Sequence, residues 1–358
     1  MFGGISTANT VRFHIAAQSS LIDAPLGIML EGLPQNQHVK IRVQRASTNP
    51  QIALESYGIF QSDASGIVNL QTQAPKEGTY SHVDGMGLFW SMERVESDTP
   101  QPPVPKPSPL SPLLFKFTAE CDGILLAETT IERRWTSPDV RRIQVRNSGM
   151  VGTYFCHTDD RPRPGIIVFG GSEGGLNEFV AAVLASHGYS TFALAYFGIE
   201  NLPSQLVDIP MEYIESAIAW FSNQPGVNEK WIGVHGTSKG GELALLTASM
   251  FPSVKAVVCV SSGGVVLHGI TAQGRDVLPG SWTYQGQTIP YASKENPHRS
   301  GKLAPPTGDT ISFRDWYNFH LADEETVQEA TIPVENIQGS ILFISGKDDA
   351  MFDSERIT

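Results

Sequence analysis

The alternation of hydrophobic and polar positions divides the chain into two differently patterned regions. Between about residue 10 and residue 135, short stretches alternate polar and apolar side chains, which is the period of half-buried strands. The clearest of them are residues 38–43, 65–70 and 124–132. Because these stretches are short, closely spaced and separated by turn residues, the first region is predicted to form an all-β sandwich.

A run of seven prolines, from Pro100 to Pro112, interrupts the first region. Such runs form stiff, extended spacers and are typical of linkers between domains. However, strand-like sequence of the same kind resumes at residues 113–117, so we predict a long loop within the first domain. The domain boundary is placed later, between residues 137 and 138.

The second region, residues 138–358, has the pattern of an α/β domain. Its strands are predicted from nearly continuous apolar runs at residues 166–169, 191–195, 232–235, 256–260 and 341–344. Such runs are typical of parallel strands that helices bury on both faces. Apolar residues at helical spacing lie between them, as at Ile214, Ala217, Ile218 and Phe221. The alternation predicts a mostly parallel sheet, interrupted at about residues 263–331 by a lid-like insertion.

Composition and charge narrow the class of protein. The chain has 358 residues, which favours two domains, and its net charge of −12 argues against nucleic acid or an anionic membrane as the main partner. No apolar run reaches the ~18 residues that span a bilayer, and no signal-peptide pattern opens the sequence. Three scattered cysteines without CxxC spacing indicate a reducing compartment, without a disulfide framework or a zinc site. These features predict a soluble cytoplasmic protein.

Two copies of the pentapeptide Gly-x-Ser-x-Gly lie in the second region, at residues 170–174 and 236–240. In α/β hydrolases this pentapeptide forms the sharp turn that lifts a nucleophilic serine above the sheet at the start of a helix. The pentapeptide is not rare, so topology must choose between the two. Ser238 has an earlier strand and the glycine loop Gly170–Gly175 upstream, as the fold requires, whereas Ser172 has no such loop before it within the domain. Ser238 is therefore predicted to be the nucleophile.

The same glycine loop is the candidate source of an oxyanion hole. An amide of Ser172 or Glu173 is predicted to supply one donor, and the amide of Lys239, at the positive end of a helix dipole, the other. An ordinary tight turn between strand and helix is the alternative interpretation of the loop. Neither glycine loop fits the Walker A or GxGxxG pattern, so no nucleotide cofactor, and no other cofactor or metal, is predicted.

The acid of a catalytic triad is expected after a later strand. The strand predicted at residues 341–344 leads into Asp348 and Asp349, of which Asp349 is the first choice and Asp348 the second. A solvated turn is the alternative interpretation of this acidic pair.

The base of the triad is the missing member. Its expected order along the chain is Ser, Asp, His, yet only nine residues follow Asp349 and none is a histidine. His268, His298 and His320 lie in the predicted insertion and are expected at the surface. We therefore expect the histidine to lie beyond Thr358, in a C-terminal part of the domain that this sequence does not include.

Longer motifs carry a resemblance to a known family. They include Gly-Met-Gly-Leu-Phe-Trp-Ser-Met at residues 85–92, Ser-Lys-Gly-Gly-Glu-Leu at residues 238–243, and the segments 332–339 and 346–349. With these motifs the chain resembles the acyl-CoA thioesterase / bile acid-CoA:amino acid N-acyltransferase family. The resemblance implies an immunoglobulin-like sandwich followed by an α/β-hydrolase domain, and a histidine a few tens of residues beyond the aspartate.

The resemblance also implies the reaction. The expected substrate and partner is a fatty acyl-CoA or a related thioester, whose phosphates Lys239 or Arg275 would meet. Members that transfer the acyl group to an amino acid tend to carry cysteine at the nucleophile, so Ser238 favours an acyl-CoA thioesterase. The alternatives are acyl transfer to an amino acid, a carboxylester or lactone hydrolase resembling the dienelactone hydrolases, and acyl-CoA binding without catalysis.

Overall fold

The chain forms two compact units, residues 1–137 and residues 138–358. The structure, a computed structural model, describes residues 10–46, 52–96, 109–271, 279–292, 312–351 and 353. The loop predicted for the proline run lies for the most part outside the described residues.

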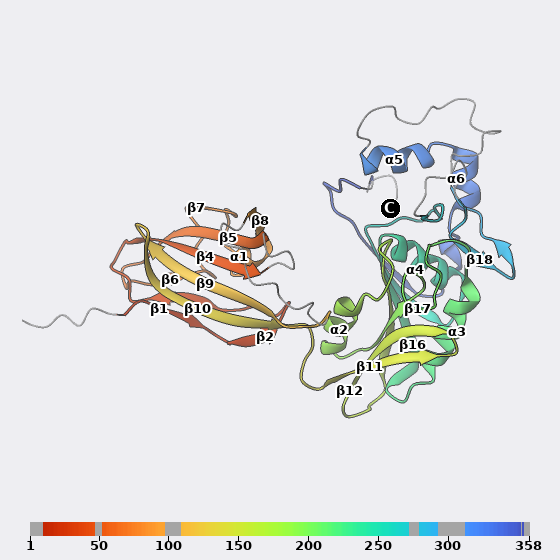
Figure 1. The fold of residues 1–358 in the computed structure, drawn as a ribbon, viewed down its shortest axis with the longest axis horizontal. Helices are drawn as coiled ribbons and strands as arrows, with labels where there is room; N and C mark the ends of the chain where they lie inside the picture. Colours follow the sequence, from red (N-terminus) through yellow and green to blue (C-terminus); the bar gives the residue numbers. More distant parts are fainter. Residues whose placement is uncertain are drawn as a thin grey trace, which may run out of the picture. The chain divides into compact units, whose positions relative to one another are not determined.

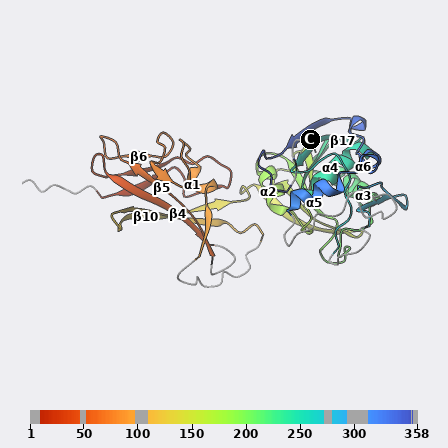
Figure 2. The ribbon, with the colours of Figure 1, turned by 90° about the horizontal axis from the view of Figure 1, so that it is seen from above.

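The first unit consists of two β-sheets and a short helix, α1 (Gly87–Trp90) (Figures 1 and 2). The three-stranded sheet has the order β1 (Arg12–Ile15), β3 (Ile28–Glu31), β6 (Val68–Asn69). The seven-stranded sheet has the order β2 (Ser19–Leu21), β10 (Ile124–Arg134), β9 (Leu113–Cys121), β4 (His38–Ala46), β5 (Ile52–Gln61), β7 (Glu77–Gly78), and β8 (Glu93–Glu96) also pairs with β5.

The alternating pattern of this unit forms its core. Along β4, Val39, Ile41 and Val43 are buried, while the residues between them are more exposed, as the two-residue period of a strand requires. The strands predicted at 38–43 and 124–132 are confirmed as β4 and β10. The stretch 65–70 yields only the two residues of β6, because the Asp63 carboxylate accepts hydrogen bonds from the following amides and holds that part in a turn. The immunoglobulin-like assignment stays a prediction.

The second unit is built on a mixed seven-stranded sheet. Its order is β11 (Val140–Asn147), β12 (Met150–His157), β14 (Ser190–Ala195), β13 (Arg163–Phe169), β16 (Val227–Thr237), β17 (Val254–Val260), β20 (Ser340–Ile344). The last five strands in this order run parallel, and they contain the five apolar runs seen in the sequence. The mostly parallel sheet is therefore confirmed. The antiparallel hairpin of β11 and β12 was not predicted.

Helices follow the parallel strands in turn (Figure 1). They are α2 (Glu178–Ser186), α3 (Met211–Ser222) and α4 (Lys239–Met250), and α3 buries the four residues whose spacing predicted it. Residues 261–339, called here the β17–β20 connection, contain the remaining elements. These are β18 (Trp282–Tyr284), β19 (Gln287–Thr288), α5 (Phe313–His320), α6 (Glu324–Ala330) and a 3₁₀ turn at Val334–Asn336, and β18 pairs with β15 (Ile209–Pro210), which precedes α3. A sheet with helices in this order is consistent with an α/β hydrolase.

One strand differs from its prediction. The run at 341–344 is confirmed as β20, but the expectation that it is buried on both faces is wrong, since Leu342 and Ile344 are 53% and 48% exposed. The reason is its place in the sheet, because β17 is its one neighbour in the part of the chain that the structure describes. None of the described helices is long and apolar enough to cross a membrane.

Candidate active site

Ser238 lies at the turn between β16 and α4. Its backbone is strained, with φ of +55° and ψ of −125°, and its amide donates a 2.8 Å hydrogen bond to the carbonyl oxygen of Val260 on β17. The glycines on either side are required. A Cβ added at Gly236 would lie 1.8 Å from the carbonyl oxygen of Gly240, and one added at Gly240 would lie 2.2 Å from that of Gly170. This strand–turn–helix has the features of a nucleophile elbow.

The glycine loop 170–175 lies beside this turn. A Cβ added at Gly171 would lie 3.4 Å from the Cβ of Ser238. The Gly171 amide is occupied, because it donates a 3.0 Å hydrogen bond to the Glu173 carboxylate. Within the described part of the chain, the amides of Ser172 and Glu173 donate to no protein acceptor. The loop therefore brings free backbone donors close to the nucleophile candidate.

The second pentapeptide has a different local structure. Ser172 is exposed, and the next helix, α2, begins only at Glu178. Ser238, in contrast, is the residue immediately before α4. Of the two serines, only Ser238 has the oriented amides of a helix N-terminus directly behind it.

The candidate acid follows a strand that ends at the same edge of the sheet. In the parallel register, Val260 pairs with Thr237 on one side and with Ile344 on the other. Ser238 and Asp349 thus both lie beyond the carboxyl ends of strands that are two positions, or about 10 Å, apart in the sheet. Asp349 is half-buried and accepts a 2.8 Å hydrogen bond from the amide of Met351, whereas Asp348 is exposed.

A small apolar hollow opens next to Ser238. Its lining residues are Ser238, Lys239, Glu242, Ser262, Gly263, Val265, Leu267, Tyr317 and Leu321. The side chains from the β17–β20 connection supply most of its apolar wall. Among the described residues that line it there is no histidine.

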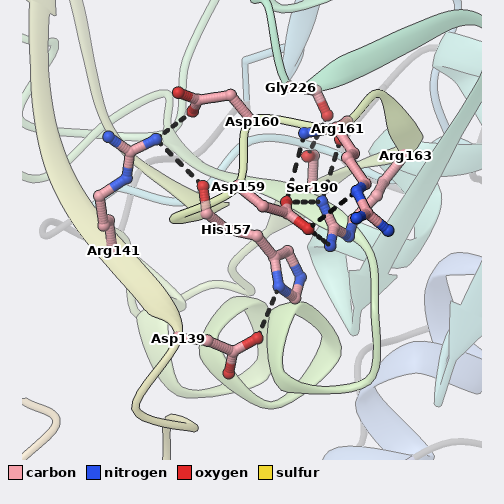
Figure 3. A network of polar contacts seen from close by, with 9 residues as sticks. All are labelled: Asp139, Arg141, His157, Asp159, Asp160, Arg161, Arg163, Ser190 and Gly226. Atoms are coloured by element: carbon pink, nitrogen blue, oxygen red, sulfur yellow. Dashed lines mark hydrogen bonds and ion pairs between the residues drawn. The ribbon is translucent and has the colours of Figure 1, made fainter.

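A histidine–aspartate pair, in which the histidine is buried and the aspartate exposed, occurs elsewhere in the second unit. The Nδ1 of His157 lies 3.0 Å from the Asp139 carboxylate, beside the ion pairs that Arg141 and Arg163 form with neighbouring aspartates (Figure 3). His157 ends β12, which runs antiparallel to β14 and pairs Phe155 with Thr191 near the start of that strand. This pair therefore lies at the amino-terminal edge of the parallel strands, about 20 Å from the edge that carries Ser238. It cannot serve as the base for that serine.

Two histidines of the β17–β20 connection also differ from expectation. His320 was expected at the surface but is only 1% exposed, and its ring lies 4.6 Å from that of His268. His268 is largely buried, which lowers its pKa to about 4. His320 is the last residue of α5, and this end of the helix is buried, with Tyr317 lining the hollow next to Ser238. The sequence pattern alone did not indicate this burial. His298 lies outside the described residues.

Lys239 does not reach the surface. Its ammonium is buried and forms a 2.8 Å ion pair with the Glu242 carboxylate one helical turn further along α4. The hypothesis that the Lys239 side chain meets the phosphates of the substrate is therefore wrong, because the charge is already neutralised inside the protein. Arg275, the other candidate for that role, lies outside the described residues. No cluster of potential metal ligands occurs among the described residues.

Comparison with known proteins gives two matches to family models. Residues 23–147 match "Acyl-CoA thioester hydrolase/BAAT N-terminal region", and residues 209–358 match "BAAT / Acyl-CoA thioester hydrolase C terminal". Acyl-coenzyme A thioesterase 2, mitochondrial, of Mus musculus is 32% identical over 339 residues, covering 93% of this chain and 70% of the relative. Acyl-coenzyme A thioesterase 1 of Homo sapiens is 30% identical, covering 93% and 75%. Acyl-coenzyme A amino acid N-acyltransferase 2 of Mus musculus is 30% identical, covering 96% and 79%.

Proposed function

Because the chain belongs to the family of acyl-CoA thioester hydrolases and bile acid-CoA:amino acid N-acyltransferases, we propose that it hydrolyses a fatty acyl-CoA or a related thioester. The observation that carries this proposal is a serine, at position 238, on a strained turn beside a loop with free amides. The relatives are named as both hydrolases and acyltransferases, so the choice between them depends on the nucleophile. A serine there favours transfer of the acyl group to water.

The proposed reaction has two steps. The Ser238 Oγ bonds to the thioester carbonyl carbon, the C–S bond breaks, and CoA leaves as a thiol that takes up the serine proton through the base. Water then attacks the acyl-serine ester and releases the carboxylic acid. The amide of Ser172 or Glu173 and that of Lys239 stabilise the negative oxygen in both steps, which is the arrangement expected of an oxyanion hole.

The proposed triad pairs Ser238 with Asp349 and a histidine. Asp349 would hold the histidine ring in the tautomer that accepts the serine proton. The family resemblance places this histidine after the aspartate, and none of the described histidines lines the hollow at Ser238. The proposal therefore assigns the base to none of the described histidines.

Free imidazole provides a test of both assignments in the 358-residue chain. If Ser238 lacks a positioned base, added imidazole should raise thiol release from an acyl-CoA on the order of tenfold, well short of the 10²–10⁴ that a positioned base supplies. Thiol release is followed with a chromogenic thiol reagent, and the Ser238→Ala variant in the same imidazole buffer gives the uncatalysed background.

The other outcomes each remove a part of the proposal. A high rate that imidazole does not raise would show that the chain supplies its own base. Acyl-CoA binding by calorimetry without thiol release in either buffer would identify a binding protein. Faster cleavage of the matching oxygen ester would favour a carboxylester or lactone hydrolase, and formation of an amide with added glycine or taurine would show acyl transfer.

A further inference from the structure

The Glu242 carboxylate is one of the most heavily bonded groups in the second unit. It lies in the first turn of α4 and is 2% exposed. Its oxygens accept hydrogen bonds from the Trp282 indole (2.7 Å), the Leu267 amide (3.0 Å) and the Lys239 ammonium (2.8 Å). Two of these three donors belong to the β17–β20 connection, so the carboxylate links that connection to the helix that begins after Ser238.

Lys239 also joins α4 to the β17–β20 connection. Its ammonium has three protons, and besides the Glu242 carboxylate it donates to the carbonyl oxygens of Leu267 (2.6 Å) and His268 (3.2 Å). Burial lowers the pKa of Lys239 and raises the pKa of Glu242, so desolvation acts against the charge on each. Each charge is therefore tolerable at this depth only because the other is present.

The pair fixes one residue in particular. Glu242 binds the N–H of Leu267 and Lys239 binds its C=O, so both polar groups of this residue are fastened to α4. The Leu267 side chain lines the hollow next to Ser238. A buried ion pair contributes little net stability compared with apolar residues of the same size, so stability alone does not account for this pair. Its place between nucleophile and hollow therefore points to a positioning role.

We propose that Glu242 and Lys239 are positioning residues that hold residues 265–268 as the wall of an acyl-binding hollow beside Ser238. Because Val265, Leu267 and Leu321 line that hollow with apolar side chains and its volume is about 30 Å³, the group it accepts is a short apolar part of the acyl chain next to the thioester carbonyl. The identity of the occupant depends on the proposed function. The claim that the ion pair holds residues 265–268 in place does not depend on the proposed function.

Glu242→Gln is the informative change, because it keeps the shape of the side chain and leaves the Lys239 ammonium without its counter-charge. We expect binding of an acyl-CoA thioether, which Ser238 cannot cleave, to weaken about tenfold by calorimetry. Hydrogen–deuterium exchange of residues 265–268 should rise in the same variant, while exchange in α3 stays unchanged. A role in overall stability alone would lower the fraction of folded protein without changing the affinity of the folded part.

Two further variants keep the test decisive. Trp282→Phe removes one neutral donor and retains the ring, so it should give a smaller rise in exchange at residues 265–268 and a smaller loss of affinity. Glu242→Gln combined with Lys239→Met removes both charges and also the ammonium's hydrogen bonds to Leu267 and His268, so it should not recover the affinity. Recovery in the double variant would show that only the unpaired charge matters and would overturn the positioning role. Unchanged exchange and unchanged affinity in folded Glu242→Gln would overturn the proposal. If the unaltered protein fails to bind the thioether at all, the proposed function fails, while the exchange result still decides the positioning role.

Discussion

Replacing Ser238 by alanine should abolish the imidazole-dependent rise in thiol release from acyl-CoA, a loss on the order of tenfold, because no acyl-enzyme can form without the hydroxyl and the effects of serine and base are not additive. The fold should be unaffected. Alanine has the same Cβ as serine, so the strain of the left-handed backbone at this position is unchanged. The amide of residue 238 can still donate its hydrogen bond to the carbonyl oxygen of Val260. Thiol release and circular dichroism check the two parts of this expectation.

A serine-directed fluorophosphonate extends the test to a measurement that needs no turnover. In imidazole buffer, which supplies the base, mass spectrometry should show one label on the unaltered protein and none on Ser238→Ala. Ser216, on the exposed side of α3, offers a matched control, and Ser216→Ala should keep both labelling and thiol release. If Ser172→Ala lost the label while Ser238→Ala retained it, the assignment of the nucleophile would pass to the other pentapeptide.

The sequence predicted the strands that the fold buries on both faces. The five parallel strands are apolar on both faces over most of the sheet, so their runs stand out from the loops around them. The β11–β12 hairpin was missed because β11 carries arginines on both of its faces, so it lacks the alternation of a half-buried strand. Arg142 and Arg146 on that strand pair with Glu178 and Glu200, which come from segments 36 and 54 residues away. Because these partners are distant in the sequence, the pattern of hydrophobic and polar residues around β11 does not indicate the ion pairs.

The candidate site also has parts that the sequence could predict and parts that it could not. The strained turn at Ser238 could be predicted from the sequence, since the order of strand, glycine loop and elbow is a property of the chain itself, and the role of Ser238 as nucleophile stays a prediction. The burial of Lys239 could not, because a lysine is exposed by default and its partners include backbone atoms 28 and 29 residues away. One signal was available. Lys239 and Glu242 are spaced i, i+3 and so share a helix face, which made their ion pair predictable but not its depth.

Gly240→Ala should be one of the most damaging single-methyl changes among the described residues of the second unit. The added Cβ would lie 2.2 Å from the carbonyl oxygen of Gly170 and 3.0 Å from that of Phe169. Both contacts are with backbone at the end of β13, so no side chain can rotate away, and α4 must move from the sheet instead. Overpacking of this kind costs about 3 kcal/mol or more, which for a domain of this size lowers the Tm on the order of 10 °C.

The displacement of α4 should also slow the reaction at Ser238, even at temperatures where the variant is still folded. Ser238 and the Lys239 amide are both at the start of this helix, so a shift there separates the nucleophile from the Gly170–Gly175 loop, and a misplacement of about 1 Å can cost 10²-fold in rate. Fluorophosphonate labelling below the Tm of the variant measures this directly. Gly264→Ala is the matched control, because a Cβ there meets nothing within 4 Å and the backbone is not left-handed, so its Tm and labelling should be unchanged. Normal labelling of a folded Gly240→Ala variant would show that the contact between α4 and β13 does not position Ser238.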